Sequence, residues 1–183
     1  MSATLSGPKS DVSWSRAPLL AALVYPQDKY PRLAFEALIA SCRRRGLSLA
    51  GVLQHLVDAA PNRRCDVVLE DLMTGHRTPI FEYRGAGATG CRLDEAALAE
   101  VAARIEGSLE GEPDLLVLNK FGKAECSGGG LLDLVADAMD REIPVVIGVP
   151  RSNLEAWRDF SGDIGIELSG CDGEIERFVE NLS

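Results

Sequence analysis

The amino-acid sequence predicts a three-layer, doubly wound α/β fold with a mostly parallel sheet and one antiparallel hairpin insertion. Three apolar runs of strand length, residues 17–25, 113–119 and 143–150, lack the polar alternation of a half-exposed strand. This is the pattern of strands that helices cover on both faces. Segments with helical spacing of apolar residues alternate with these runs, and that order produces parallel strands joined by helical crossovers.

The first half of the chain contains a strand, a helix, a second strand and a hairpin. Residues 17–25 predict the first core strand, and residues 31–46 predict a helix with Pro31 in its first turn and Gly46 as its stop. Residues 48–57 predict the second strand. Residues 65–83 predict an antiparallel hairpin at a sheet edge, because a turn signal at Gly75 separates two short strands.

The second half of the chain returns to alternating helices and strands. Asp94 can cap a helix that runs to about Gly107. We predict a strand at residues 113–119, a helix at residues 130–142 and a strand at residues 143–150. Residues 162–183 predict a short strand followed by a closing helix. Between residues 150 and 162, Trp157 and Phe160 predict a short helix that packs over the sheet edge, or alternatively a lid over a ligand.

Length and composition indicate one compact domain, residues 17–183, after a polar segment, residues 1–16, that we expect to be a flexible tail. The chain has 183 residues, of which 46% are hydrophobic and 26% charged. Its net charge of −9 argues against broad binding to nucleic acid or anionic membranes. The five cysteines form no CxxC pair, and we see no secretory leader, so we expect a cytoplasmic protein without a metal site.

Cationic residues follow each of the three predicted core strands. Lys29 and Arg32 follow the first strand, Lys120 and Lys123 the second, and Arg151 the third. In an open α/β sheet, ligands bind beyond the carboxyl ends of the strands. We therefore expect a small anionic ligand at this edge, such as phosphate, a nucleotide or another oxyanion.

Other groups could complete this site, although each has a simpler interpretation. Gly128 and Gly129 could present N–H groups to an anion, or they could form a flexible connection. Arg92 could supply a further cation from the glycine-rich loop of residues 84–92, whose default interpretation is a mobile loop. Glu125 could accept a proton, although an ion pair with Lys123 is the more frequent arrangement.

Cys91 precedes Arg92 at the start of a predicted helix, where a thiol can become reactive. No histidine or aspartate in the sequence pattern supports nucleophilic catalysis there, so no catalytic residue is predicted.

Four segments carry a resemblance to a known family: "LNKFGKAE" (residues 118–125), "GCRLDEAAL" (residues 90–98), "AGVLQ" (residues 50–54) and "LEAWRDF" (residues 154–160). Through them the chain resembles the domain-of-unknown-function family 2478, over roughly residues 17–168. That bacterial group is similar to the cancer-related nucleoside-triphosphatases, which are P-loop proteins. The resemblance implies a fold of the P-loop NTPase type, and the genes of the family often lie near molybdate-transport genes.

The sequence departs from the triphosphatase pattern at both nucleotide-binding motifs. A P-loop needs glycines, a lysine for the phosphates, and Ser or Thr for magnesium. Counting back from Gly46 along the first predicted helix places the last glycine of the P-loop pattern at Tyr30. The lysine of the pattern falls on Pro31 and its Ser/Thr on Arg32. The Asp-Glu pair that the related family uses to hold magnesium and water is replaced by Asn119 and Lys120. A lysine can replace the charge of a metal ion but cannot activate water as the metal does.

Three functions therefore remain open. The first is a non-hydrolysing protein that binds a small anion or nucleotide, with Asn119 orienting the ligand, and that serves as an accessory or sensor in molybdenum or oxyanion handling. The second is a metal-independent phosphoryl-transfer or nucleotide-hydrolysing enzyme that relies on fixed lysine charge. The third is a protein-interaction domain without a ligand, favoured if its own side chains fill the pocket. In that case the edge hairpin could pair two copies in a homodimer.

Overall fold

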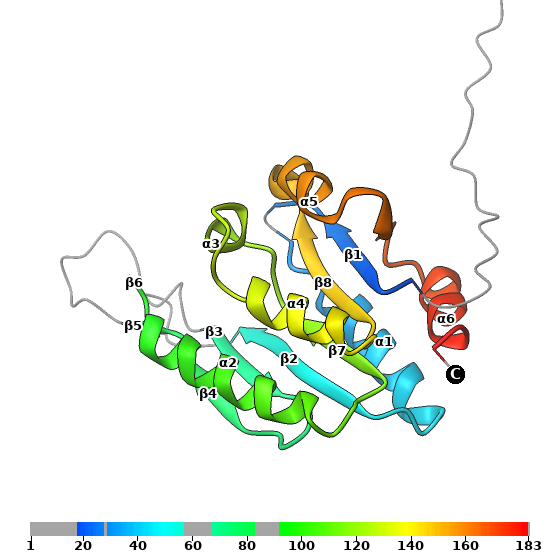
Figure 1. Cartoon of the computed structure of the whole chain (residues 1–183), viewed down its shortest axis with the longest axis horizontal. Helices are drawn as coiled ribbons and strands as arrows, with labels where there is room; N and C mark the ends of the chain where they lie inside the picture. The colour runs from blue at the N-terminus through cyan, green and yellow to red at the C-terminus, as the bar shows by residue number, and fades with distance from the viewer. Residues whose placement is uncertain (1–17, 28, 57–66, 83–91, 183) are drawn as a thin grey trace, which may run out of the picture.

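The computed structural model describes residues 18–27, 29–56, 67–82 and 92–182, so the predicted N-terminal tail lies outside the described residues. It confirms the three-layer α/β fold. The central sheet has seven strands in the order β4-β3-β2-β7-β8-β1-β9 (Figure 1). These strands are β1 (Leu20–Tyr25), β2 (Leu49–Leu56), β3 (Val67–Asp71), β4 (Arg77–Pro79), β7 (Leu115–Leu118), β8 (Val145–Pro150) and β9 (Gly165–Leu168). Neighbouring strands from β2 to β9 are parallel, whereas β3 and β4 extend the sheet in antiparallel fashion.

Helices cover both faces of this sheet. They are α1 (Arg32–Arg44), α2 (Glu95–Leu109), α3 (Lys123–Cys126), α4 (Leu132–Asp140), α5 (Leu154–Ser161) and α6 (Asp172–Glu180). One core cluster joins α1 and α6 to the sheet, and a second joins α2, α4 and α5 to the opposite face. Two 3₁₀ turns, Arg151–Asn153 and Gly162–Ile164, flank α5.

Strand β1 shows why the core strands read as continuous apolar runs. Leu20 and Ala22 pack into the cluster that contains α2, α4 and α5. Ala21 and Leu23 pack into the cluster that contains α1 and α6. Because successive side chains of a strand point to opposite faces, a strand between two helical layers needs apolar residues at every position.

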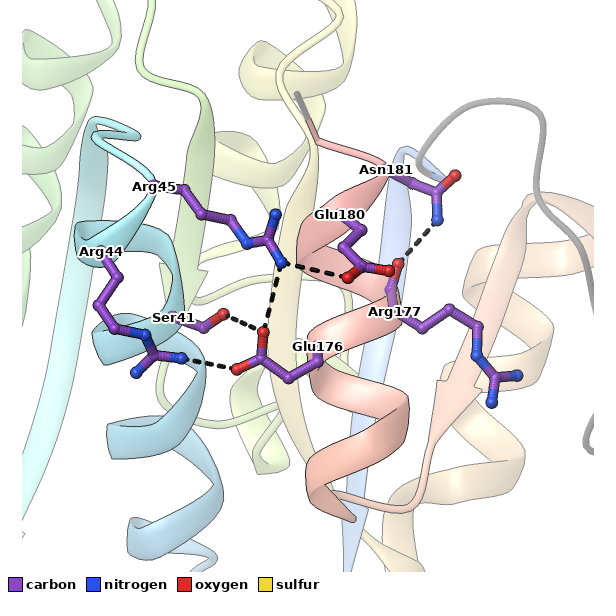
Figure 2. Close-up of polar contacts among 7 residues, drawn as sticks. All are labelled: Ser41, Arg44, Arg45, Glu176, Arg177, Glu180 and Asn181. Carbon is purple, nitrogen blue, oxygen red and sulfur yellow. Dashed lines mark hydrogen bonds and ion pairs between the residues drawn. The ribbon is translucent and has the colours of Figure 1, made fainter.

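Polar contacts join α1 to α6 at the surface above their shared core (Figure 2). Oγ of Ser41 donates to Glu176 at 2.9 Å, and the guanidinium of Arg44 donates to the other oxygen of this carboxylate at 2.7 Å. Arg45 bridges Glu176 and Glu180 at 3.5 and 3.2 Å. These contacts hold the carboxyl-terminal helix against the first helix of the fold.

The structure confirms the predicted antiparallel hairpin, and the second of its strands is short. Strands β3 and β4 pair around a turn in which Gly75 has a φ of +71°. The second strand ends at Pro79, and the N–H of the next residue, Ile80, donates to the carbonyl of Val67 at 3.2 Å. The chain then forms β5 (Phe81–Glu82), which pairs with β6 (Arg92–Leu93) in a separate ribbon.

Strand β4 forms the edge of the central sheet, as the sequence predicts for this insertion. It is three residues long and ends in a proline, which leaves few backbone groups for pairing with another chain. Homodimer formation stays a prediction.

Candidate functional site

The candidate site lies at the edge of the sheet where the parallel strands end. Three loops leave the sheet there: residues 26–31 after β1, residues 119–122 after β7, and the turn Arg151–Asn153 after β8. Figure 1 shows α3 and α5 at the end of the sheet toward which β8 points. The three cation-bearing segments predicted from the sequence therefore share one edge, as parallel strand topology requires.

Neutral side chains tie these loops together. Nδ2 of Asn119 donates to Oε1 of Gln54 at 3.2 Å, which links the end of β7 to β2. Nδ2 of Asn153 donates to the carbonyl of Phe121 at 2.8 Å, which links the β8 loop to the β7 loop. The Ser152 hydroxyl donates to Oε1 of Gln27, which links the β8 loop to the β1 loop. The edge is therefore one connected surface rather than three independent loops.

Exposed cations are concentrated on this surface. Lys29, Lys120 and Lys123 are three of the four lysines in the sequence, and all three are exposed. Arg151 is exposed beside them on the β8 loop. Within the described residues none of these four forms an ion pair. Arg32, the fifth predicted cation, is engaged, because its Nε donates to Glu36 at 2.7 Å.

The loop after β1 is filled by an aromatic side chain. The ring of Tyr30 stacks on Phe35 at 5.4 Å and meets Tyr25 edge to face at 5.9 Å. Burial raises the pKa of Tyr30 strongly, with a smaller opposing effect from the backbone of Gln54, and raises that of Tyr25 to about 12. The Tyr30 hydroxyl is buried beside the backbone of Gln54, and no contact of full hydrogen-bond geometry reaches it from the described residues. Helix α1 begins directly afterwards, with no side-chain cap.

The loop after β7 is organised by a buried carboxylate. Glu125 is only 7% exposed, and its Oε2 and Oε1 accept the N–H groups of Gly122 and Leu131 at 2.8 and 2.9 Å. The expected pairing with Lys123 is therefore wrong, because both carboxylate oxygens bind backbone donors instead. This role of Glu125 could not be predicted from the sequence, since it depends on how the loop folds back on itself.

The predicted glycine donors are also used inside this loop. The N–H of Gly128 donates to the carbonyl of Glu125, and that of Gly129 donates to the carbonyl of Ala124, both at 3.0 Å. In this conformation neither group is free to bind an anion. Their assignment as ligand-binding residues stays a prediction that requires the loop to open.

Arg92 lies apart from the three loops. It is exposed in β6, two residues before the predicted capping residue Asp94, whose Oδ1 accepts the N–H of Ala97 at 2.9 Å. This confirms the predicted start of α2. No contact within the described residues links Arg92 to the loops after β1, β7 or β8, and Cys91 lies outside the described residues.

Aromatic residues close the α5 side of the edge. Trp157 is 1% exposed and meets Phe121 at 5.6 Å, which confirms its packing role. Phe160 contacts the same Phe121 ring at 5.9 Å but is 40% exposed. Phe121 therefore anchors the β7 loop to α5, and it was not singled out from the sequence.

A groove of about 620 Å³ lies elsewhere, between α1 and the antiparallel strands. Its lining residues are Glu36, Ile39, Ala40, Arg43, Arg44, Leu53, His55, Glu70, Leu72 and Arg77. Its charged side chains are already engaged: Glu70 lies 2.7 Å from Arg77, and Glu36 pairs with Arg32. Arg44 donates to Glu176 at 2.7 Å, and Arg43 donates to the carbonyl of Leu72 at 3.4 Å. We take the strand edge as the candidate site because its cations lack such partners and because ligands of open α/β sheets bind there.

The part of the chain that the structure describes contains no group of three His, Cys, Asp or Glu side chains suited to hold a metal ion. None of its helices is both long and apolar enough to cross a membrane. The strand edge itself offers fixed positive charge together with neutral hydrogen-bonding amides, and this combination suits an anion.

The fold has a counterpart among solved structures. The crystal structure of THEP1 from the hyperthermophile Aquifex aeolicus superposes with a TM-score of 0.58, over 90% of this chain and 96% of that chain, at 13% sequence identity. At this identity the likeness establishes the fold, which is of the P-loop NTPase type.

A curated relative is similar in sequence. The chain is 35% identical over 157 residues to the molybdenum import ATP-binding protein ModC 2 of Bradyrhizobium diazoefficiens. The match covers 85% of this chain but only 17% of that protein. Residues 20–177 match the family described as "Protein of unknown function (DUF2478)", and the chain therefore belongs to the DUF2478 family.

Proposed function

We propose that this protein binds a small anion, either an inorganic oxyanion or a nucleotide, at the edge formed by the loops after β1, β7 and β8, and that it does not hydrolyse its ligand. One observation carries the proposal: loops tied to one another by side-chain hydrogen bonds bring four exposed cations, Lys29, Lys120, Lys123 and Arg151, to one surface without ion-pair partners among the described residues. Such a surface attracts anions, and its connected loops limit the ordering cost of binding.

Lys120 and Lys123 are the principal binding residues in this proposal. Lys120 follows the buried strand β7 after a single residue, so its backbone position is held close to the core. Asn119 is 8% exposed and held by Gln54, which places its amide as a fixed hydrogen-bonding group beside Lys120. Because the lysine side chains are exposed, we expect binding to be moderate in strength and sensitive to salt.

The other predicted binding residues would contribute only after rearrangement. Arg32 would have to release Glu36, and the N–H groups of Gly128 and Gly129 would have to release their carbonyl partners. Arg92 would have to reach the site from the β5–β6 ribbon. We therefore assign these four residues a secondary role.

Support for the proposed absence of hydrolysis comes from the groups at the end of β7. Asn119 and Lys120 follow this strand, at the position where the triphosphatase pattern has two carboxylates. The nearest carboxylate in the same loop, Glu125, already accepts two backbone N–H groups. An ammonium group cannot coordinate magnesium, and neither an ammonium group nor an amide accepts a proton from water as a carboxylate does.

The relative from Bradyrhizobium suggests a biological setting. Its name is that of a molybdenum import ATP-binding protein, and a region similar to this chain forms part of it. Molybdate is a small tetrahedral dianion, which a lysine-rich surface would suit. We propose an accessory or sensor role in molybdenum or oxyanion handling.

Isothermal titration calorimetry with phosphate, molybdate, tungstate and ATP tests the binding proposal. We expect saturable heats for at least one of these anions and no release of phosphate from ATP. A Lys120→Ala/Lys123→Ala variant should lose the heats, whereas Arg77→Ala/Arg141→Ala, which removes the same charge elsewhere, should keep them. The proposal fails if no anion binds, if the wild type releases phosphate from ATP, or if the lysine variant binds as well as the wild type.

A second candidate function is a protein-interaction domain without a ligand. The observation that favours it is the Tyr30 ring, which packs on Phe35 and Tyr25 and fills the loop after β1 with the protein's own side chain. Failure of all four anions in calorimetry, together with capture of a defined partner protein, would favour this function over anion binding.

A further inference from the structure

We infer that the anion enters this site without a divalent cation, so that the ligand class is a metal-free oxyanion rather than a magnesium-bound nucleotide. This inference rests on the proposed anion-binding function and makes it more specific. It follows from the sign of the charged groups at the strand edge, from the contacts that the carboxylates already form, and from the charge of the possible ligands.

The first step concerns the cation at the end of β7. Strand β7 is wholly buried, and the exposed Lys120 follows it after a single residue, Asn119. An ammonium group has three donors and no acceptor, so it cannot coordinate a metal ion and repels one instead. Lys123, Lys29 and Arg151 on the connected loops add charge of the same sign.

The second step concerns two carboxylates on the segments that carry these cations. Magnesium sites in proteins use carboxylate oxygens together with phosphate and water. In the β7 loop, Glu125 is buried and both of its oxygens accept backbone N–H groups. In the first turns of α1, Glu36 is held by Arg32 at 2.7 Å. These two carboxylates are therefore engaged in contacts that a metal ion would have to break.

The third step concerns the ligands themselves. Nucleoside triphosphates bind magnesium between their phosphates, and the bound ion cancels much of the negative charge that attracts lysine. A small dianion such as phosphate or molybdate presents its full charge without a metal ion. A surface of cations and neutral amides consequently discriminates against the magnesium complex and accepts the small oxyanion.

Calorimetry with and without magnesium tests this inference. Phosphate and ATP are each titrated into wild-type protein in EDTA and in excess MgCl₂, with NaCl added to equalise ionic strength. We expect the affinity for ATP to fall by about tenfold or more when magnesium is present, because the charge of the ligand is reduced. The affinity for phosphate should change by less than about twofold, a difference well under 1 kcal/mol.

The control variants separate the two proposals. Lys120→Ala/Lys123→Ala should abolish the magnesium-sensitive part of ATP binding, whereas Arg77→Ala/Arg141→Ala should leave it unchanged. Tighter binding of ATP with magnesium would overturn this inference while leaving anion binding intact. Loss of all binding in both conditions would instead overturn the proposed function itself.

Discussion

Oε1 of Glu125 accepts a hydrogen bond from the N–H of Leu131 at 2.9 Å, across the glycine run that separates α3 from α4. Oε2 of the same carboxylate accepts the N–H of Gly122 at 2.8 Å. One buried side chain thus holds both ends of the loop that carries Lys123. The loop at the candidate site is preorganised by an acidic residue that is not available for catalysis.

Glu125→Ala should destabilise the protein by about 3 kcal/mol, because two backbone donors lose a charged, buried acceptor. For a chain of this size the thermal midpoint should fall by roughly 6–12 °C. Thermal denaturation followed by circular dichroism measures this shift. Glu155→Ala, at an exposed position on α5, provides a matched control that should stay within about 0.5 kcal/mol of wild type. Equal midpoints for the two variants would show that Glu125 does not organise the loop.

Gly130→Ala should destabilise the loop more than Gly128→Ala. Both glycines have positive φ, +63° for Gly130 and +81° for Gly128, so each alanine incurs backbone strain of about 1 kcal/mol. A Cβ at Gly130 would lie 2.1 Å from Oε1 of Glu125, whereas a Cβ at Gly128 meets nothing within 4 Å. Urea denaturation of the two variants isolates the effect of the clash. If Gly128→Ala were the less stable, the close approach of Glu125 to Gly130 would be ruled out.

Tyr30→Phe should leave stability unchanged or raise it slightly, since no contact of full hydrogen-bond geometry reaches the buried hydroxyl from the described residues. Tyr30→Ala should cost about 3–5 kcal/mol, because the ring packs on Phe35 and Tyr25. Chemical denaturation of both variants provides the measurement. A large loss for Tyr30→Phe would mean that the hydroxyl has a partner that stabilises the fold.

The contacts around Glu176 predict a pH dependence of stability. The pKa of Glu176 lies below its ordinary value, first because Ser41 donates to it and then because Arg44 and Arg45 lie beside it, with desolvation opposing (Figure 2). A lowered pKa in the folded state stabilises the fold above the pKa of the unfolded chain, about 4.3 for Glu. That contribution disappears as the pH falls through the lower, folded-state value.

Glu176→Gln should therefore lower the thermal midpoint at pH 7, and its difference from wild type should shrink as the pH falls below about 4. Thermal melts of wild type and variant across this range measure the difference. Glu100→Gln, an exposed position on α2, serves as the control and should track the wild type throughout. A difference that persists at low pH would assign the effect of Glu176→Gln to packing rather than charge.

The order of helices and strands could be predicted from the sequence because each signal was local. The apolar run that became β1, the Asp94 cap of α2 and the Gly75 turn depend on residues close together in the chain. The edge that bears Lys120 and Lys123 could be predicted as well, because parallel topology alone brings strand ends together.

The details of the site could not be predicted, because they depend on contacts between distant or looping segments. Gln54 lies near the end of a mostly apolar strand, and its contact with Asn119 joins positions 65 residues apart. Glu125 binds the backbone on either side of α3, and the chain leaves the hairpin after β4 to form a second ribbon. A polar residue inside an apolar strand was the one signal that could have pointed to Gln54.

Mapping the bound anion by NMR tests the central claim most directly. Phosphate is titrated into ¹⁵N-labelled protein in EDTA, and the shifts of the backbone amides are followed. The account predicts saturable shifts at Asn119, Lys120 and Lys123 and in the turn Arg151–Asn153, all absent in Lys120→Ala/Lys123→Ala. Shifts confined to the groove residues Arg43, His55 and Arg77, or no saturable shift at all, would contradict it.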